Sequence, residues 1–294
     1  MSPSTRATEP RPASVRGGLA TIGPETLALR AALEQRYLRW AAEVDAVPMM
    51  YPPLMRVEDL ARIDYFANFP HLAILGSQLA EDSVGKYGDA AKGDTEAAAS
   101  STAMAEIPAG DLTGATYVLP SAACYNIYFD MAGRVLDGPE LITTVATCFR
   151  RETHYDELRR LLGFSMREIV CVGEREVVLE HLSSHKRKLI GFFAEIGLPI
   201  EVEAASDPFY ESGGSRALMA QLFPVKEEFV YNGNAIGSVN FHRNFFGERC
   251  DIRTADGQPA FSGCVAFGIE RWISALTTHF GVGPGELCER IVSS

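Results

Sequence analysis

The stretch ATCFRRETHYDELRRLLGFSMREIVCVG, residues 146–173, decides how the rest of the sequence is interpreted. Both of its ends alternate apolar with polar residues, which predicts two β-strands joined by a loop. Five arginines and four acidic residues are crowded into this hairpin. Such a hairpin is either a solvated loop crossed by ion pairs or a surface that faces a polyanion.

Alternation along the two strands assigns side chains to the faces of the sheet. Arg150 and Glu152 are two residues apart and share one face, whereas Arg167 and Glu168 are adjacent and point to opposite faces. An arginine, a glutamate and an aromatic ring such as Phe164 on one face can hold a nucleotide, because guanidinium binds phosphate bidentately and the ring stacks on the base. From spacing alone, a surface lattice of ion pairs is the commoner arrangement.

Length and charge limit the classes of function. The chain has 294 residues, enough for one large domain or two small ones. It carries 27 basic and 38 acidic residues, for a formal net charge of −11. This balance argues against a broad nucleic-acid surface, which needs a basic face, but it allows a local anion site. No uninterrupted apolar run approaches ~18 residues, so we expect no membrane span.

The N-terminal residues and the cysteines indicate the cellular setting. Residues 1–22 contain no hydrophobic segment of the secretory type, and we expect a disordered tail there. None of the six cysteines forms a CxxC pair, and six in a chain of this length do not make a disulfide framework. A reducing, cytoplasmic setting is expected.

Hydrophobic periodicity predicts three main helices, over residues 23–44, 174–197 and 268–280. Strands that follow one another between few helices predict an α+β fold with a mostly antiparallel sheet, in a single domain over residues 23–294. The Ala/Ser/Gly-rich residues 87–107 predict a mobile surface insertion. The expected strands are 116–120, 144–152, 165–173, 226–231, 235–244 and 248–254. The apolar stripes of the helices are Leu29, Leu33, Tyr37, Trp40 and Val44, then Val178, Leu182, Leu189, Phe193 and Ile196, then Ile269, Trp272, Ile273 and Leu276.

Two further groups of residues can carry chemistry. In SGCVAFGIERW (262–272), a strand of small residues leads into a helix whose first turn holds Arg271, which can reach a phosphate over the sheet or simply lie on the surface. Cys124, Glu168 and Cys264 are far apart in the chain, so only the fold can unite them. Two thiolates and a carboxylate would bind Zn²⁺ and leave a fourth position open. Cysteines without CxxC spacing are more often inert buried side chains.

These stretches together resemble class II aminoacyl-tRNA synthetases. CFRRE (148–152), with Arg160 four residues before Phe164, resembles motif 2 of that class, and AFGIERW (266–272) resembles motif 3. SGCVAFGIERW, ACYNIYFDMAGR and GFSMREIVCVG are most similar to atypical zinc-dependent seryl-tRNA synthetases, and closer still to their truncated homologues, the amino acid:[carrier protein] ligases. YPPLMRVEDLARIDYFANFP (51–70) is similar, over a shorter match, to their motif 1 region. The resemblance covers roughly residues 25–285.

The resemblance implies roles for individual residues. Arg150 and Arg271 would be the catalytic arginines, with Arg150 on the α-phosphate of ATP and on the substrate carboxylate. Arg160 and Arg271 would hold the γ-phosphate, Glu152 would bind the adenine amine, and Phe164 would stack on the adenine. The further implied ATP contacts are Leu161, Lys226, Ser238, Val239 and Asn240; the implied zinc ligands are Cys124, Glu168 and Cys264; the implied substrate contacts are Glu168 and Asp207. Ala266 stands where motif 3 normally opens with glycine, which we expect to tighten the ATP pocket.

The implied activity is ATP-dependent activation of a small amino acid, glycine or alanine, to its adenylate, with Mg²⁺ and one Zn²⁺ as cofactors. The acceptor would be the phosphopantetheine thiol of a carrier protein, since the chain lacks the length and charge for a tRNA-binding domain. The basic segment HKRK (185–188), on the predicted polar face of its helix, would receive this carrier or would simply be solvated. Aminoacylation of tRNA and a non-catalytic amino acid- or nucleotide-binding subunit are the alternatives. The motif 1 resemblance also implies a homodimer.

Overall fold

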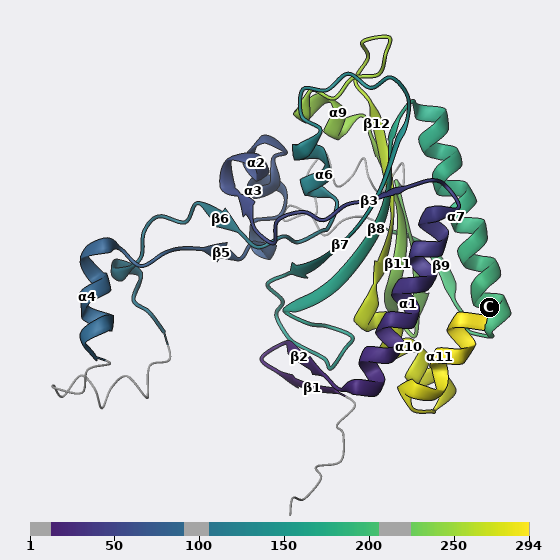
Figure 1. Ribbon diagram of the computed structural model, residues 1–294, viewed down its shortest axis with the longest axis horizontal. Helices are drawn as coiled ribbons and strands as arrows, with labels where there is room; N and C mark the ends of the chain where they lie inside the picture. Colours follow the sequence, from purple (N-terminus) through teal and green to yellow (C-terminus); the bar gives the residue numbers. More distant parts are fainter. Residues whose placement is uncertain (1–12, 91–105, 206–224, 294) are drawn as a thin grey trace, which may run out of the picture.

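The computed structural model describes residues 13–90, 106–205 and 225–293. At its centre lies a seven-stranded sheet in the spatial order β3-β7-β8-β12-β11-β10-β9 (Figure 1). Within this sheet β3 pairs in parallel with β7, and the other neighbours are antiparallel, which confirms the expected α+β class. The strands are β3 (Val47–Pro48), β7 (Glu140–Phe149), β8 (Gly163–Gly173), β12 (Phe261–Gly268), β11 (Asn234–Arg243), β10 (Lys226–Tyr231) and β9 (Glu201–Ala205).

The quoted hairpin supplies two central strands of this sheet. β7 and β8 pair in unbroken register from Glu140 opposite Val172 to Phe149 opposite Gly163. Side chains alternate along β8, so Ile169 packs into the core on one face and Val170 into a second core on the other. The same alternation sends Arg167 and Glu168 to opposite faces, as predicted.

Four helices cover one face of the sheet (Figure 1): α1 (Pro24–Ala42), α7 (Arg175–Ile196), α10 (Ile269–Phe280) and α11 (Pro284–Ser293). The predicted apolar stripes are buried here, except that Val44 lies just beyond the end of α1 and is partly buried. Tyr37 stacks on Phe267 of β12 with ring centroids 4.2 Å apart, and it meets Trp272 edge to face. Such aromatic pairs contribute about 0.5–1.5 kcal/mol each beyond the burial of their area.

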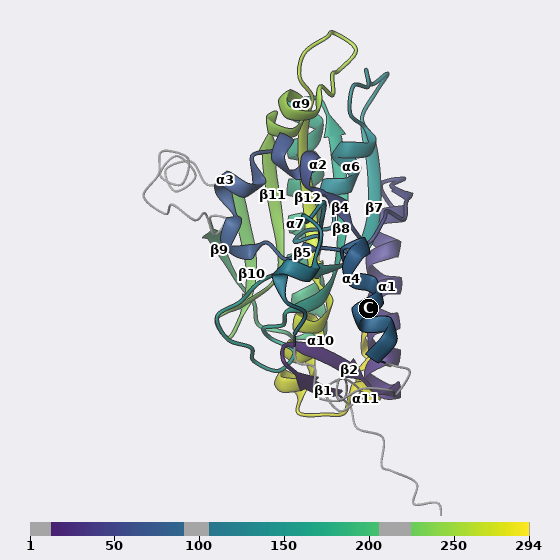
Figure 2. The same cartoon turned by 90° about the vertical axis from the view of Figure 1, so that its left-hand side faces the viewer.

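Shorter helices lie over part of the opposite face: α2 (Val57–Arg62), α3 (Tyr65–Asn68), α6 (Tyr125–Asp130) and α9 (Phe245–Cys250). Figure 2 shows α2, α3 and α6 in front of the strands. They form a second hydrophobic cluster with Val170, Val172 and Cys264 of the sheet. None of the helices in the described part of the chain is long and apolar enough to cross a membrane.

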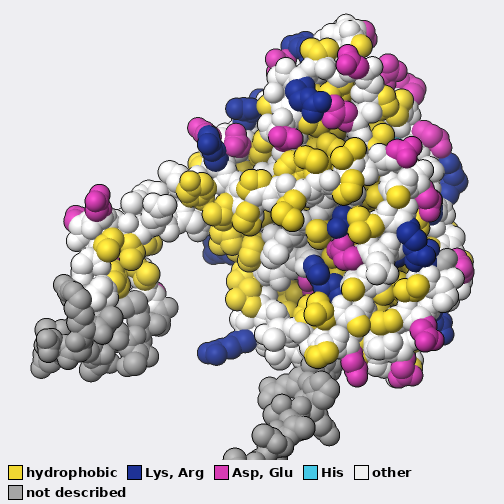
Figure 3. Space-filling model, in the orientation of Figure 1, with side chains coloured by type: hydrophobic (Ala, Val, Ile, Leu, Met, Phe, Trp, Pro, Cys, Tyr) yellow, Lys and Arg dark blue, Asp and Glu magenta, His cyan; other side chains and the backbone are white. Residues whose placement is uncertain are grey.

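An arm projects from this side of the molecule (Figures 1 and 3). Its base is a small sheet of β4 (Met55–Arg56), β6 (Tyr117–Val118) and β5 (Leu75–Gly76), and its end carries α4 (Glu81–Ala90). Asp111 holds the end together, because it accepts hydrogen bonds from Lys86 at 2.6 Å and from Tyr87 at 2.5 Å. The expected mobile insertion 87–107 is thus helical as far as residue 90, and residues 91–105 lie outside the described residues.

The prediction of a disordered tail is wrong for residues 13–22. These residues form the hairpin β1 (Ala13–Arg16) and β2 (Leu19–Ile22), and residues 1–12 lie outside the described part. Gly17 and Gly18 turn the chain with positive φ. A Cβ on Gly18 would lie 2.6 Å from the Tyr155 ring, and the Gly18 carbonyl accepts a hydrogen bond from the Leu162 amide. The hairpin is therefore anchored to the loop between β7 and β8.

The expected strand 248–254 is also wrong. Its first residues complete α9, and Asp251 then reverses the chain with φ 53°. Of the remainder, Arg253 makes isolated bridges to Val135 and Pro259. Apolar alternation in this segment reflects a helix end that packs against β12.

Candidate active site

Two adjoining cavities lie over the sheet face opposite α1, α7 and α10. The first is lined by the loop between β7 and β8, by strands β8, β10, β11 and β12, and by the first turn of α10. The second, of about 860 Å³, lies between the sheet and helices α3, α6 and α9. Arg150, Met166, Lys226, Ser238 and Ala266 line both cavities, so the two form one continuous site.

Arg150 stands where the cavities meet. It directly follows β7, and its Nε donates a hydrogen bond to the Ser121 carbonyl at 3.1 Å. The guanidinium carbon lies 5.2 Å from the centre of the Phe164 ring, in cation–π contact. These contacts fix the side chain while leaving its terminal nitrogens available to a ligand.

Glu152 and Arg160 meet across the loop. Arg160 donates to Glu152 Oε2 at 2.9 Å, and the loop is closed by backbone hydrogen bonds between Arg160 and Asp156. Glu152 and Leu161 line the first cavity beside Phe164. The loop thus brings a carboxylate and an aromatic ring to the cavity, although β7 ends at Phe149 and the strand alternation expected for Arg150 and Glu152 does not extend to them.

Arg271 enters from the first turn of α10. Its Nε donates to the Arg159 carbonyl at 2.8 Å, and its Nη1 donates to the Ala235 carbonyl at 2.9 Å. Burial lowers the pKa of Arg271, and the positive charges of Arg150 and Arg160 lower it further. Arg150, Arg159 and Arg271 line this cavity, and guanidinium groups so placed can bind a multiply charged anion.

The side chains of the remaining predicted ATP contacts lie on both faces of the sheet. Lys226 and Ser238 line the first cavity, where Lys226 also forms a 2.9 Å ion pair with Glu228. Val239 points into the helix-covered core, so its side chain cannot reach a ligand there. Asn240 lines the second cavity only. Asp207 lies outside the described residues.

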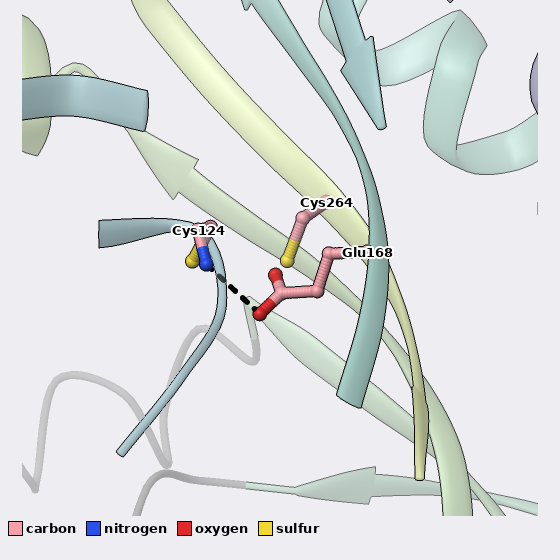
Figure 4. Close-up of side chains that lie close together, drawn as sticks. All are labelled: Cys124, Glu168 and Cys264. Carbon is pink, nitrogen blue, oxygen red and sulfur yellow. Dashed lines mark hydrogen bonds between the residues drawn. The ribbon is translucent and has the colours of Figure 1, made fainter. Parts of the chain in front are cut away.

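Cys124, Glu168 and Cys264 come together in the second cavity (Figure 4). Their ligand atoms lie within 4.8 Å of one another, and all three residues are buried. Glu168 pairs with Ala266 across β8 and β12, so Cys264 is its diagonal neighbour on the same face, and Cys124 arrives at the start of α6. Within the part of the chain that the structure describes, no other group of this kind is found.

The donor atoms of this trio suit a cation, which would displace the thiol protons on binding. Glu168 Oε1 accepts hydrogen bonds from the Ala123 and Cys124 amides at 2.9 and 3.2 Å. Its Oε2 is buried with no hydrogen-bond partner among the described residues, which is costly unless an ion or a ligand binds it. The hydrogen bond with Cys264 and burial raise the pKa of Cys124 well above its ordinary value. Two sulfurs and one carboxylate oxygen with a free position fit Zn²⁺.

Sequence reasoning overlooked His242. Its Nε2 lies 3.7 Å from Cys264 Sγ, and its Nδ1 lies 3.0 Å from the Tyr128 hydroxyl. The spacing of two from Asn240 to His242 indicates a shared face and was the available signal. A bulge in β11, which the spacing does not reveal, sets the position of the ring.

The expectation that the whole HKRK segment lies on the polar face of its helix is wrong at His185. His185 is 1% exposed and points into the core, where its Nδ1 lies 2.9 Å from the His181 carbonyl. Lys186 pairs with Glu227, Arg187 with Glu180, and Lys188 with Glu43. Position 185 shares the buried stripe of α7 with Val178, Leu182 and Leu189, because seven residues make about two helical turns.

The fold is that of a class II aminoacyl-tRNA synthetase core. The structure of M. kandleri SerRS in complex with A. aeolicus tRNASec superposes with a TM-score of 0.78, over 95% of this chain and 56% of that one, at 21% identity. Giardia lamblia prolyl-tRNA synthetase in complex with prolyl-adenylate gives a TM-score of 0.64, over 90% and 48%, at 14% identity. The chain thus spans about half the length of these two structures.

Two curated relatives come from Bradyrhizobium diazoefficiens. Amino acid–[acyl-carrier-protein] ligase 1 is 31% identical over 245 residues, which are 80% of this chain and 72% of that protein. Amino acid–[acyl-carrier-protein] ligase 2 is 32% identical over 246 residues, 78% and 68% of the two chains. No protein-family model matches the chain. The chain belongs to the family of amino acid–[acyl-carrier-protein] ligases.

Proposed function

We propose that this enzyme activates a small amino acid with ATP and transfers the aminoacyl group to the phosphopantetheine thiol of a carrier protein. One observation carries the proposal: Arg150 stands between a cavity lined by arginines and a second cavity that holds a Cys–Glu–Cys trio. A triphosphate and an amino acid bound in these two cavities would meet at this guanidinium. The names of the two Bradyrhizobium ligases support the carrier protein as acceptor.

ATP would occupy the first cavity. Phe164 would stack on the adenine, Glu152 would accept from its exocyclic amine, and Arg160 and Arg271 would hold the γ-phosphate with Mg²⁺. Arg150 would bind the α-phosphate and the attacking carboxylate and keep them in line. No general base is needed, since the carboxylate is already a nucleophile, and pyrophosphate leaves as the negative charge spreads over oxygens held by guanidinium groups.

The amino acid would occupy the second cavity beside Cys124, Glu168 and Cys264. When bound by this trio, Zn²⁺ would offer its open position to the free α-amino group, which distinguishes an amino acid from a simple carboxylic acid. The protein's part is to hold the two sulfurs and the Glu168 carboxylate in place and to exclude water. Resemblance favours glycine or alanine, whose difference of one methyl group corresponds to only ~1–3 kcal/mol of discrimination.

We further propose a cytoplasmic homodimer. β3 lies at an edge of the large sheet, and beside it Met50 is 92% exposed, with Val47 and Met49 also exposed. Apolar side chains along a sheet edge are typical of a surface that another chain covers.

ATP–pyrophosphate exchange across the amino acids, with metal analysis of the same sample, tests the activation step. We expect exchange with a small amino acid and about one zinc ion per chain. Labelled amino acid offered to tRNA and to phosphopantetheinylated carrier protein side by side then identifies the acceptor. Labelled tRNA with unlabelled carrier protein would refute the transfer step, and the absence of exchange with any amino acid would refute activation.

A further inference from the structure

Two side-chain nitrogens of strand β11 lie beside the Cys264 sulfur. Asn240 Nδ2 lies 3.2 Å from Sγ, and His242 Nε2 lies 3.7 Å from it. Asn240 is directly opposite Cys264 in the register of β11 and β12, and His242 follows two residues later. Neither belongs to the trio whose ligand atoms lie within 4.8 Å of one another.

The backbone of β11 is bent at this point. Its register with β12 shifts between Phe241 and Arg243, which makes His242 the extra residue of a β-bulge. Arg243, a residue with a large side chain, adopts φ 55° in the left-handed region. Bulges and strained residues of this kind occur beside active sites, where they re-aim a side chain. Here the re-aimed side chain is the imidazole that contacts Cys264.

The neighbours of the His242 ring allow its Nε2 to carry the hydrogen. Nδ1 lies 3.0 Å from the Tyr128 hydroxyl and 3.3 Å from the Ser262 hydroxyl. Burial raises the pKa of Tyr128 well above its ordinary value, so its hydroxyl keeps its proton and can donate it to Nδ1. The ring of Phe246 stands at 88° to the imidazole, with centroids 5.1 Å apart, and limits its rotation. With Nδ1 as the acceptor, the neutral imidazole carries its hydrogen on Nε2, which faces sulfur.

We propose that His242 and Asn240 are positioning residues for the metal site, each donating an N–H group to the Cys264 sulfur. This inference rests on the zinc binding proposed above. Two thiolates and a carboxylate bring more negative charge to a buried site than one divalent cation neutralises, and N–H donors stabilise the excess charge on sulfur. They also hold Sγ toward Glu168 and Cys124. Outer partners of metal ligands typically account for 10–100-fold in metal affinity.

Zinc dissociation constants measured by chelator competition test the proposal. His242→Phe keeps an aromatic ring but removes the donor, and we expect ~10–100-fold weaker zinc binding. His242→Gln places an amide N–H near the Nε2 position and should recover most of the affinity. His279→Phe is the matched control, since that imidazole also contacts a tyrosine hydroxyl, Tyr231, at the far end of α10. It should bind zinc like the wild type.

A cobalt-substituted protein supplies a second readout. The thiolate-to-cobalt charge-transfer band depends on hydrogen bonds to sulfur, so we expect it to shift in His242→Phe and to return toward the wild-type position in His242→Gln. A merely structural role for His242 would change stability without moving this band. An unmoved band together with unchanged zinc affinity would overturn the proposal, and so would imidazole scattering in the zinc X-ray absorption spectrum, which would make His242 a ligand.

Failure of the positioning role can be distinguished from misfolding of a variant and from failure of the proposed metal site. Where His242→Phe does not fold, the double variant Tyr128→Phe with Ser262→Ala removes both hydroxyls beside Nδ1, and a wild-type affinity in that variant would overturn the proposal. Wild-type protein that binds no zinc would refute the proposed metal site as well. Tight zinc binding in the wild type and equally tight binding in every variant would refute only the positioning role.

Discussion

Replacing Arg150 by lysine tests the contact on which the proposed chemistry depends. The structure places the Arg150 guanidinium at the junction of the two cavities, with Nε engaged by the Ser121 carbonyl and the carbon atom over the Phe164 ring. The two terminal nitrogens remain for the α-phosphate and for the substrate carboxylate. Lysine keeps the positive charge but offers a single nitrogen, so it cannot bind both groups at once.

The size of the effect follows from the contact that is lost. Removal of one preorganised donor from developing charge costs about 3–4 kcal/mol in the transition state. Because 1.36 kcal/mol corresponds to a factor of ten, we expect kcat/KM for ATP–pyrophosphate exchange to fall by ~10²–10³. Arg150 lines both cavities, so the KM values for ATP and for the amino acid should both rise. Arg271 lines only the first, and Arg271→Lys should raise the KM for ATP while leaving that for the amino acid unchanged.

Arg151→Lys is the matched control for Arg150→Lys. Arg151 is the next residue, its side chain is exposed, and it lines neither cavity. We expect its exchange rate to stay within about twofold of the wild type. Exchange by Arg150→Lys within about threefold of the wild type, at an unchanged melting temperature, would show that the guanidinium does not join the two substrates.

Three other measurements probe the site and the core. Cys264→Ser should lose bound zinc in metal analysis, whereas Cys288→Ser, at a cysteine outside the trio, should keep it. Burial lowers the pKa of His181 to about 3, so as the pH falls the histidine is protonated first in the unfolded chain. The free energy of unfolding measured by urea titration should therefore fall as the pH drops from ~6.5 toward 3, and His181→Leu should flatten this dependence. Arg167→Met leaves the partly buried Glu34 carboxylate without its ion-pair partner at 2.6 Å. We expect the free energy of unfolding in denaturant titration to fall by about 3 kcal/mol. A loss below about 1 kcal/mol would mean that solvent screens the pair.

The sequence predicts those features that depend on periodicity. The stripe of α1 from Leu29 to Trp40 and the stripe of α10 are buried as spacing requires. Alternation along β8 places Arg167 and Glu168 on opposite faces, and both contacts follow: Arg167 reaches Glu34 of α1, and Glu168 faces Cys124. These predictions hold because every residue of a regular element has its direction set by the element itself.

Predictions from charge and composition alone were less successful. HKRK looks polar as a sequence, but helical geometry places His185 on the buried stripe and leaves its charged neighbours to pair with nearby glutamates. The N-terminal segment looks like a tail because its order comes from Gly18 packing against Tyr155, a contact across more than a hundred residues. The bulge at His242 likewise depends on how β11 meets β12. Tertiary contacts of this kind leave no local pattern in the sequence.

One register accounts for both the core and the site. Glu168 faces Cys124 and Cys264 only because it pairs with Ala266. The same pairing turns Arg167 toward Glu34 and sets Val265 and Phe267 into the helix-covered core. A slip of one residue between β8 and β12 would bring Glu168 beneath α1 and Arg167 among the cysteines, with unpaired charge on both faces. The apolar core and the buried ion pair therefore hold the proposed zinc ligands in place, since a one-residue slip that loses the site also loses the packing of the sheet.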